Sequence, residues 1–189
     1  MNKIIILLSL TLGFISCKNS DTKIDQLAIA KQYYQVLDHS DDVGVASLLS
    51  DSIVIRESEY DYQETFTPEE YVEWMKWDAV FDPTYEILEI ELEHEVVRAK
   101  ISKVDKRIMF LHQEPIVTHE IVSFDANKII QIERTEYLVF NDSTFVKNRE
   151  DLLSWIDQNH PELNGFIHDQ TESGGMKYLE AIELYNHRK

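Results

Sequence analysis

The sequence of 189 residues contains little cysteine, little glycine and little positive charge. Its single cysteine excludes an internal disulfide, and its five glycines offer few positions for a loop that cradles phosphate. Lysine and arginine number 18 against 35 aspartates and glutamates, which gives a formal net charge of -17. So acidic a chain is not expected to bind nucleic acid, because binding to the phosphate backbone needs a surplus of positive charge.

The sequence also lacks the motifs that assign a reaction. It contains no nucleophile elbow, no Walker loop and no dinucleotide-binding fingerprint. The histidines that could ligate a metal lack zinc-site spacing and a cysteine partner; they are His112, His119, His160 and His168. We therefore expect neither a metal nor a cofactor.

The first residues have the composition of an export signal. One lysine precedes an apolar run that ends at Cys17 and is too short for a stable membrane-spanning helix. Residues 14–17, FISC, resemble the lipobox of bacterial lipoprotein signal peptides. The resemblance implies cleavage before Cys17 and its lipidation, with a signal peptide over residues 1–16 and a polar tether over 17–23. We therefore expect a lipid-anchored protein of the cell envelope, on the outer membrane or on a membrane that faces the periplasm.

Helices are predicted before and after a long central region. Apolar residues with three- and four-residue spacing predict an amphipathic first helix, and polar residues cap a short second one. Thr67, Pro68 and Glu70 form a capping box at the start of the third. The predicted ranges are 22–39, 40–50 and 68–79.

The central region, Thr84 to Tyr137, has the pattern of an antiparallel meander. A change of phase near Leu88 and Glu89 predicts a bulge that bends its first strand. A turn at His94 and Glu95 would set opposite each other the pairs Leu92 and Val97, Ile90 and Ala99, and Leu88 and Ile101.

Other strands are expected around this pair. The predicted ranges are 52–57 and 59–66 ahead of the meander, and 107–112, 116–124 and 129–137 within it. After residue 140 the alternation stops. Asn148 is the expected cap of a further helix, and a last helix is predicted with one stripe of Met176, Leu179 and Ile182.

Three segments carry a resemblance to a known superfamily: Ala30–Leu37 (AKQYYQVL), Asp41–Ile55 (DDVGVASLLSDSIVI) and Phe124–Glu133 (FDANKIIQIE). In their order of helices and strands they resemble the nuclear transport factor 2-like superfamily, which includes SnoaL-like polyketide cyclases and ketosteroid isomerase. The resemblance implies an α+β fold in which a cone-shaped, curved antiparallel sheet packs against three N-terminal helices around a pocket. It also implies a homodimer through the outer face of the sheet. The domain would span residues 24–140, with 141–189 as a C-terminal helical extension of it.

The resemblance to ketosteroid isomerase also suggests pocket residues. It places Tyr33 near the tyrosine that polarises the substrate oxygen, although the apolar stripe of the first helix runs through Tyr34. Glu57 falls near the position of the general base, and a solvated glutamate at the end of a strand is the competing interpretation. No residue replaces the second, protonated acid of that family.

Two further candidates depend on the turn over residues 125–128. A two-residue turn places His119 opposite Arg134, whereas a three-residue turn places Thr118 nearer to that arginine. Arg134 would bind a ligand carboxylate or pair with a neighbouring glutamate. Trp74 and Trp77 on the third helix would line the mouth of the pocket or pack in the core.

The sequence therefore supports two main hypotheses of function. The preferred one is an envelope lipoprotein that binds a small apolar or mixed ligand, or a protein partner, without catalysis. The other is a SnoaL-like isomerase or cyclase that uses Glu57 or His119 for proton transfer. In a third, the protein is purely structural and its last helices fill the mouth of the cone. Fold resemblance alone does not choose among these hypotheses.

The lipid anchor is directly testable. A fatty-acid analogue fed to cells should label the wild-type protein and leave Cys17→Ala unlabelled, because the thiol is the expected attachment point. Equal labelling of both proteins, detected in the gel band, would refute lipidation at this residue.

Overall fold

A computed structural model describes residues 25–188. The predicted signal peptide, the tether and Cys17 lie outside the described residues, as does Lys189. Within the described range no helix has the length and the apolar content needed to cross a membrane.

The described helices and strands follow the predicted order except at residues 107–112. The α-helices are α1 (Gln26–Asp38), α2 (Asp42–Leu48), α3 (Pro68–Ala79), α4 (Lys106–Leu111), α5 (Asp142–Asn159) and α6 (Glu172–Asn186). The strands are β1 (Leu49–Glu57), β2 (Tyr62–Phe66), β3 (Thr84–Glu93), β4 (Val96–Val104), β5 (Ile116–Asp125) and β6 (Lys128–Val139). Short 3-10 helices cover Ser58–Tyr60, Pro161–Leu163 and Phe166–His168.

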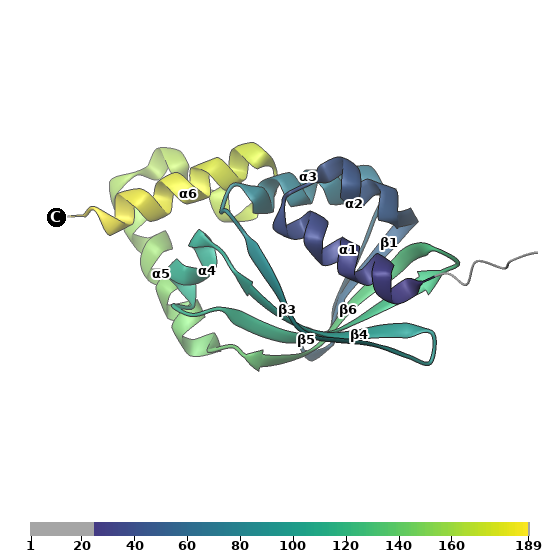
Figure 1. Ribbon diagram of the computed structural model, residues 1–189. Coiled ribbons are helices and arrows are strands. Elements are labelled where there is room, and N and C mark those ends of the chain that lie inside the picture. Colours follow the sequence, from purple (N-terminus) through teal and green to yellow (C-terminus); the bar gives the residue numbers. More distant parts are fainter. Residues whose placement is uncertain (1–24, 189) are drawn as a thin grey trace, which may run out of the picture.

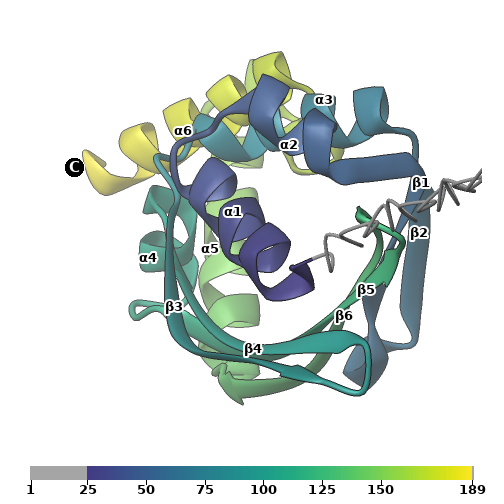
Figure 2. The same cartoon turned by 45° about the vertical axis from the view of Figure 1, so that its right-hand side comes forward.

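One curved sheet in the order β2-β1-β6-β5-β4-β3 forms the cone. Figure 2 shows the sheet curving around α1, while α2 and α3 lie above its open side (Figures 1 and 2). The α+β fold class is confirmed. The described strand pairs are antiparallel except β1 with β6, which run parallel, so the sheet is mixed where the sequence predicted an antiparallel one.

Two local predictions in the first half of the fold are confirmed. The capping box of α3 is present, with the Thr67 side chain accepting from the Glu70 amide and the Glu70 side chain accepting from the Thr67 amide. The bulge in β3 is also present, as a register shift between Ile87 and Glu89. Its exact place makes one predicted pair wrong, because Ile87 rather than Leu88 lies opposite Ile101.

The prediction of a strand over residues 107–112 is wrong. These residues form α4 and its end, because the Asp105 side chain accepts a hydrogen bond from the Ile108 amide at 2.5 Å and caps the helix. Ile108 and Leu111 are buried and Met109 is exposed, which fits one turn of a helix. In the sequence, such a short run of apolar residues also fits a strand.

Two predictions in the C-terminal extension are also corrected. Helix α5 begins after Asn141, whose side chain accepts from the Thr144 amide. Asn148 lies inside α5 and donates instead to the carbonyl of Leu111 at 2.9 Å, which ties the extension to α4. In α6, Met176 is 61% exposed, and Tyr178 and Ala181 are buried in its place.

The interior consists of two apolar clusters. The first fills the cone between α1, α2, α3 and the concave face of the sheet. The second joins Trp77, Phe81 and Leu111 to the buried side chains of α5 and α6. Trp74 packs against both clusters, so the extension shares its core with the cone.

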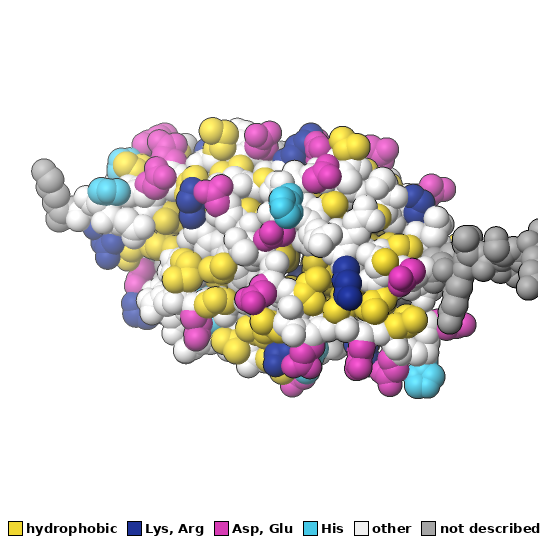
Figure 3. All heavy atoms as spheres, in the orientation of Figure 1, with side chains coloured by type: hydrophobic (Ala, Val, Ile, Leu, Met, Phe, Trp, Pro, Cys, Tyr) yellow, Lys and Arg dark blue, Asp and Glu magenta, His cyan; other side chains and the backbone are white. Residues whose placement is uncertain are grey.

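Acidic side chains are dispersed over one face of the molecule. On the face shown in Figure 3, Asp and Glu side chains are spread over the molecule, with Lys and Arg among them. On the outer side of the β3–β4 pair, Glu91 lies opposite Arg98 and Glu89 opposite Lys100.

The shared core predicts that the extension and the cone unfold together. Ile156 is fully buried in the second cluster, so Ile156→Ala should lower the free energy of unfolding by about 2–5 kcal/mol. The exposed Met176→Ala, in the same extension, should change it by less than about 0.5 kcal/mol. Denaturant unfolding followed by circular dichroism and by tryptophan fluorescence checks both values; a separate transition for the extension would contradict the shared core.

Candidate functional site

A cavity of about 570 Å³ lies inside the cone. The concave faces of β1, β4, β5 and β6 line it on one side, and α1, α3 and α4 line it on the other. Much of its surface is aromatic: Tyr33 and Tyr34 come from α1, and Tyr71, Trp74 and Trp77 come from α3. The three residues from α3 recur at three-residue spacing, which places them along one side of that helix.

The C-terminal extension supplies a further wall of this cavity. Four residues of α5 line it, namely Asp142, Phe145, Val146 and Arg149. Their spacing of three, four and seven residues defines one face of the helix. The extension therefore borders the cavity without filling it.

A buried carboxylate, Glu120, lies among hydrogen-bond donors at the base of the cavity. Its Oε2 accepts from the Tyr34 hydroxyl at 2.9 Å, and its Oε1 accepts from Thr118 Oγ1 at 3.1 Å and from Arg134 Nε at 3.2 Å. Glu120 is only 6% exposed. Three donors and one opposite charge offset the loss of its hydration.

Glu57 lies on the other side of the same arginine. Arg134 Nη1 donates to Glu57 Oε1 at 2.5 Å, and the Tyr137 hydroxyl donates to Glu57 Oε2 at 3.0 Å. Burial alone would lower the pKa of Arg134, but Glu120, Tyr137 and Glu57 outweigh burial and raise that pKa well above its ordinary value. The guanidinium is therefore committed to two carboxylates, and both oxygens of Glu57 are occupied.

Two tyrosine hydroxyls meet in the upper part of the cavity. Tyr33 Oη and Tyr71 Oη are 2.5 Å apart, and both side chains are buried. Burial raises the pKa of each hydroxyl, so both stay protonated at neutral pH. One hydroxyl donates to the other, and the second proton is available to an acceptor on a ligand.

A second charged cluster lies at the α3–α4 end. Lys103 Nζ contacts both carboxylate oxygens of the buried Asp78, at 2.6 and 2.7 Å, and the Tyr85 hydroxyl donates to Asp78 Oδ2 at 2.9 Å. Lys103 Nζ also lies 3.8 Å from Asp105, and Arg107 lies 3.5 Å from the same carboxylate. The Arg107 guanidinium stacks 5.1 Å from the ring centre of Trp77.

The structure places five of the six predicted pocket residues around this one cavity. The residues that line it are Tyr33, Tyr34, Glu57, Trp74 and Arg134. The sequence offered Tyr33 and Tyr34 as alternatives, and both of these α1 residues line the cavity. Whether these side chains bind a ligand stays a prediction. His119 lies elsewhere: its Nδ1 is 3.1 Å from Glu136 Oε2, and both side chains are about half-exposed.

The β5–β6 register explains the position of His119. The turn has two residues, with Asp125 opposite Lys128, yet neither His119 nor Thr118 lies opposite Arg134. Register shifts along the pair bring Glu120 there instead. The expected pairing of Arg134 with a neighbouring glutamate is therefore observed, with Glu120 as that residue and Glu57 as a second partner.

Sequence reasoning missed several cavity residues. Tyr71 was detectable, since it lies one turn after the capping box on the same helix as Trp74. Asp78 and Lys103 were not, because their contact joins α3 to β4, which are distant in the sequence. Arg107 was not, because it lies in α4, where a strand was predicted. Arg149 was missed because the helix was predicted to begin at Asn148, whereas α5 begins after Asn141.

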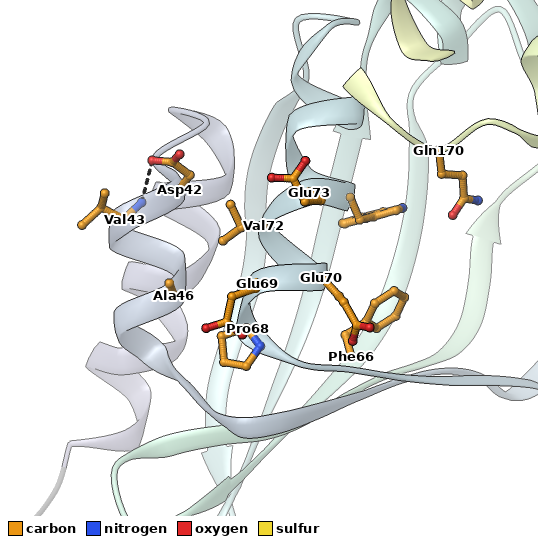
Figure 4. A pocket seen from close by; sticks show the side chains of 11 residues that line it. Asp42, Val43, Ala46, Phe66, Pro68, Glu69, Glu70, Val72, Glu73 and Gln170 are labelled. Carbon is orange, nitrogen blue, oxygen red and sulfur yellow. Dashed lines mark hydrogen bonds between the residues drawn. The ribbon is translucent and has the colours of Figure 1, made fainter. Parts of the chain in front are cut away.

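An open groove of about 660 Å³ adjoins the cavity on the outside, between α2 and α3 (Figure 4). Phe66, Trp74 and Gln170 line both the groove and the cavity. Figure 4 shows Gln170, from the C-terminal extension, beside α3. Among residues 25–188 no three His, Cys, Asp or Glu side chains converge in a metal-binding arrangement.

Comparison with solved structures identifies the fold. A candidate ketosteroid isomerase from Kribbella flavida DSM 17836 matches with a TM-score of 0.52 and 10% identity, over 62% of this chain and 80% of that one. A nuclear transport factor 2-like protein of unknown function from Cytophaga hutchinsonii ATCC 33406 matches with a TM-score of 0.50 and 10% identity, over 67% of this chain and 98% of that one. No protein-family model and no curated protein sequence matches.

At 10% identity these matches show the fold of the chain alone. The described chain has the fold of the nuclear transport factor 2-like superfamily, as the sequence resemblance implied. The fold alone leaves the activity open.

The charged cluster around Asp78 predicts a pH-dependent contribution to stability. Burial raises the pKa of Asp78, but Lys103, Arg107 and the hydrogen bond from Tyr85 outweigh burial and hold the pKa below its ordinary value. The ionised carboxylate therefore stabilises the fold above the unfolded pKa of about 3.9, and this contribution disappears as the pH falls through the lower folded value.

Asp78→Asn should accordingly lower the free energy of unfolding by about 3 kcal/mol at pH 7, and the difference from wild type should shrink below about pH 4. Urea unfolding at both pH values measures the difference. The matched variant Glu73→Gln removes an exposed partner of Lys76 on the same helix and should change little at either pH. A deficit in Asp78→Asn that stays constant with pH would contradict the assignment.

Proposed function

We propose that this protein is a lipid-anchored protein of the cell envelope whose cone binds a small apolar or amphipathic ligand without catalysis. The observation that carries the proposal is the cavity itself. Its volume of about 570 Å³ lies within the range of about 300–1,000 Å³ that is usual for small-molecule sites. Its aromatic lining with a few buried polar groups is also typical of such sites.

The state of the carboxylates favours binding over proton transfer. A general base needs a free oxygen within reach of the substrate proton. Each oxygen of Glu57 already accepts one hydrogen bond, from Arg134 and from Tyr137, and Glu120 accepts three, so part of the accepting capacity of both carboxylates is taken up within the protein. His119, the other candidate base, does not line the cavity.

A second candidate function, a SnoaL-like isomerase or cyclase, has one observation in its favour. The Tyr33–Tyr71 pair keeps a hydroxyl proton available inside the cavity that Glu57 also lines. Such a hydroxyl can polarise a carbonyl oxygen. In an enzyme of this kind Glu57 would accept the proton on a lone pair that Arg134 and Tyr137 leave free.

The anchor part of the proposal rests on the sequence around Cys17. A protein held at a membrane surface by acyl chains would have its cavity close to the lipid phase. Such a position suits a ligand that is sparingly soluble in water.

Filling the cavity tests the proposal. The neutral fluorescent probe phenylnaphthylamine should bind the wild-type domain saturably, and Val146→Trp should weaken binding by at least about tenfold, roughly 1.4 kcal/mol, because the indole would occupy cavity space. Glu150→Trp adds the same side chain to an exposed position on α5 and should leave binding unchanged. Circular dichroism checks that both variants fold.

Equal binding by wild type and Val146→Trp, or no binding to wild type, would overturn the proposal. Mass spectrometry of small molecules that copurify with wild type, and not with Val146→Trp, would identify the natural ligand.

A further inference from the structure

Positive charge exceeds negative charge at one end of the cavity. Lys103, Arg107 and Arg149 line this end, and the carboxylates that pair with them are Asp78 and Asp105. Three cations therefore face two anions. The whole chain has a net charge of -17, so its overall composition would not predict a local excess of positive charge.

Arg149 is the source of this excess. Among residues 25–188 it is the one arginine with neither an ion pair nor a hydrogen bond; the others pair with a carboxylate or, for Arg188, with a carbonyl. Its side chain is half-buried on the face of α5 that lines the cavity. The nearest acid on that face, Asp142, is seven residues away, about 10 Å along the helix.

Neighbouring groups add unused hydrogen-bond donors. Trp77 Nε1 and Arg107 Nε are buried without a hydrogen-bond partner among the described residues, although both side chains line the cavity. Arg107 from α4 and Arg149 from α5 both line the cavity, and Asn148, next to Arg149, donates to the carbonyls of Phe110 and Leu111 at the end of α4, so the two helices meet at this end. Both atoms are enclosed, so they add positive potential to this end of the cavity without contacting a ligand themselves.

On the sheet side of the cavity, the positive charge of Arg134 is balanced by carboxylates. There Arg134 is shared by Glu57 and Glu120, so the charged row on the sheet offers no free cation to a ligand. Of the cavity residues that the structure describes, those at the end formed by α4 and α5 are the ones that offer an anionic group an uncompensated positive charge.

We infer that the cavity selects a ligand with a carboxylate at one end of an apolar body, and that Arg149 binds the carboxylate with Arg107 beside it. Arg149 carries the selectivity, because Arg107 already has Asp105 as a partner. The apolar body lies along the aromatic side chains of α3. This inference rests on the proposed function, since it names the chemical class of the ligand that the cavity takes.

A matched pair of probes tests the inference: the fluorescent fatty acid dansylaminoundecanoic acid and its neutral methyl ester. Wild type should bind the acid more tightly than the ester. Arg149→Gln should weaken binding of the acid by about tenfold and leave the ester unchanged, because a charge-assisted hydrogen bond is lost only with the acid. Titrations at low ionic strength measure all four affinities.

Lys147→Gln is the matched control. It removes one positive charge from the same helix, but Lys147 is exposed, pairs with Asp151 and does not line the cavity. It should leave both affinities unchanged. Equal loss of acid binding in Lys147→Gln and Arg149→Gln would show general attraction to positive charge and overturn the inference.

The outcomes separate this inference from the proposed function. If ester and acid bind wild type equally, or if Arg149→Gln weakens both alike, the carboxylate site is refuted while ligand binding stands. If neither probe binds wild type and phenylnaphthylamine also fails, the proposed function falls and this inference falls with it.

Discussion

The cone depends on one row of charges across three strands. Arg134 of β6 lies opposite Glu57 of the parallel neighbour β1 and opposite Glu120 of the antiparallel neighbour β5. All three side chains point into the cavity. An unpaired charge at such a depth would cost several kcal/mol, so strand registers that separate these residues are strongly disfavoured. Apolar burial stabilises the sheet as a whole, and the row helps to select the one register in which every buried charge has a partner.

The same register keeps the cavity open. Bulges at Ile87–Glu89 in β3 and at Ile129–Gln131 in β6, opposite Phe124 and Ser123, accompany the curvature of the sheet. The curved sheet then surrounds α1 (Figure 2), whose Tyr34 donates to Glu120 and so ties the helix to the charged row. A flat sheet would bring the apolar faces together and leave no internal space.

Sequence patterns predicted those parts of the fold that depend on local signals. The capping box at Thr67 and the phase change at Leu88 each lie within a few residues, and each appears where expected. The charged row could not be predicted from the sequence, because the bulge in β6 falls within a run of isoleucines. Ile129 and Ile132 are both buried although they differ in phase, and Ile130 between them makes either alternation equally plausible from the sequence. That ambiguity concealed Glu120 as the partner of Arg134 and suggested His119 as a pocket residue.

The cone and the extension contribute differently to the chemistry of the cavity. Charges on the strands neutralise one another: Arg134 is shared by two glutamates, and Lys103 of β4 is held by Asp78 and Asp105. The extension adds α5, and with it a cation that has no partner in the described chain. Because paired charges cannot discriminate between a neutral ligand and an anion, selectivity for charge has to come from the added helix. In the proposed function, the shared fold provides the enclosed space, and the segment after β6 determines which polar group of a ligand that space accepts.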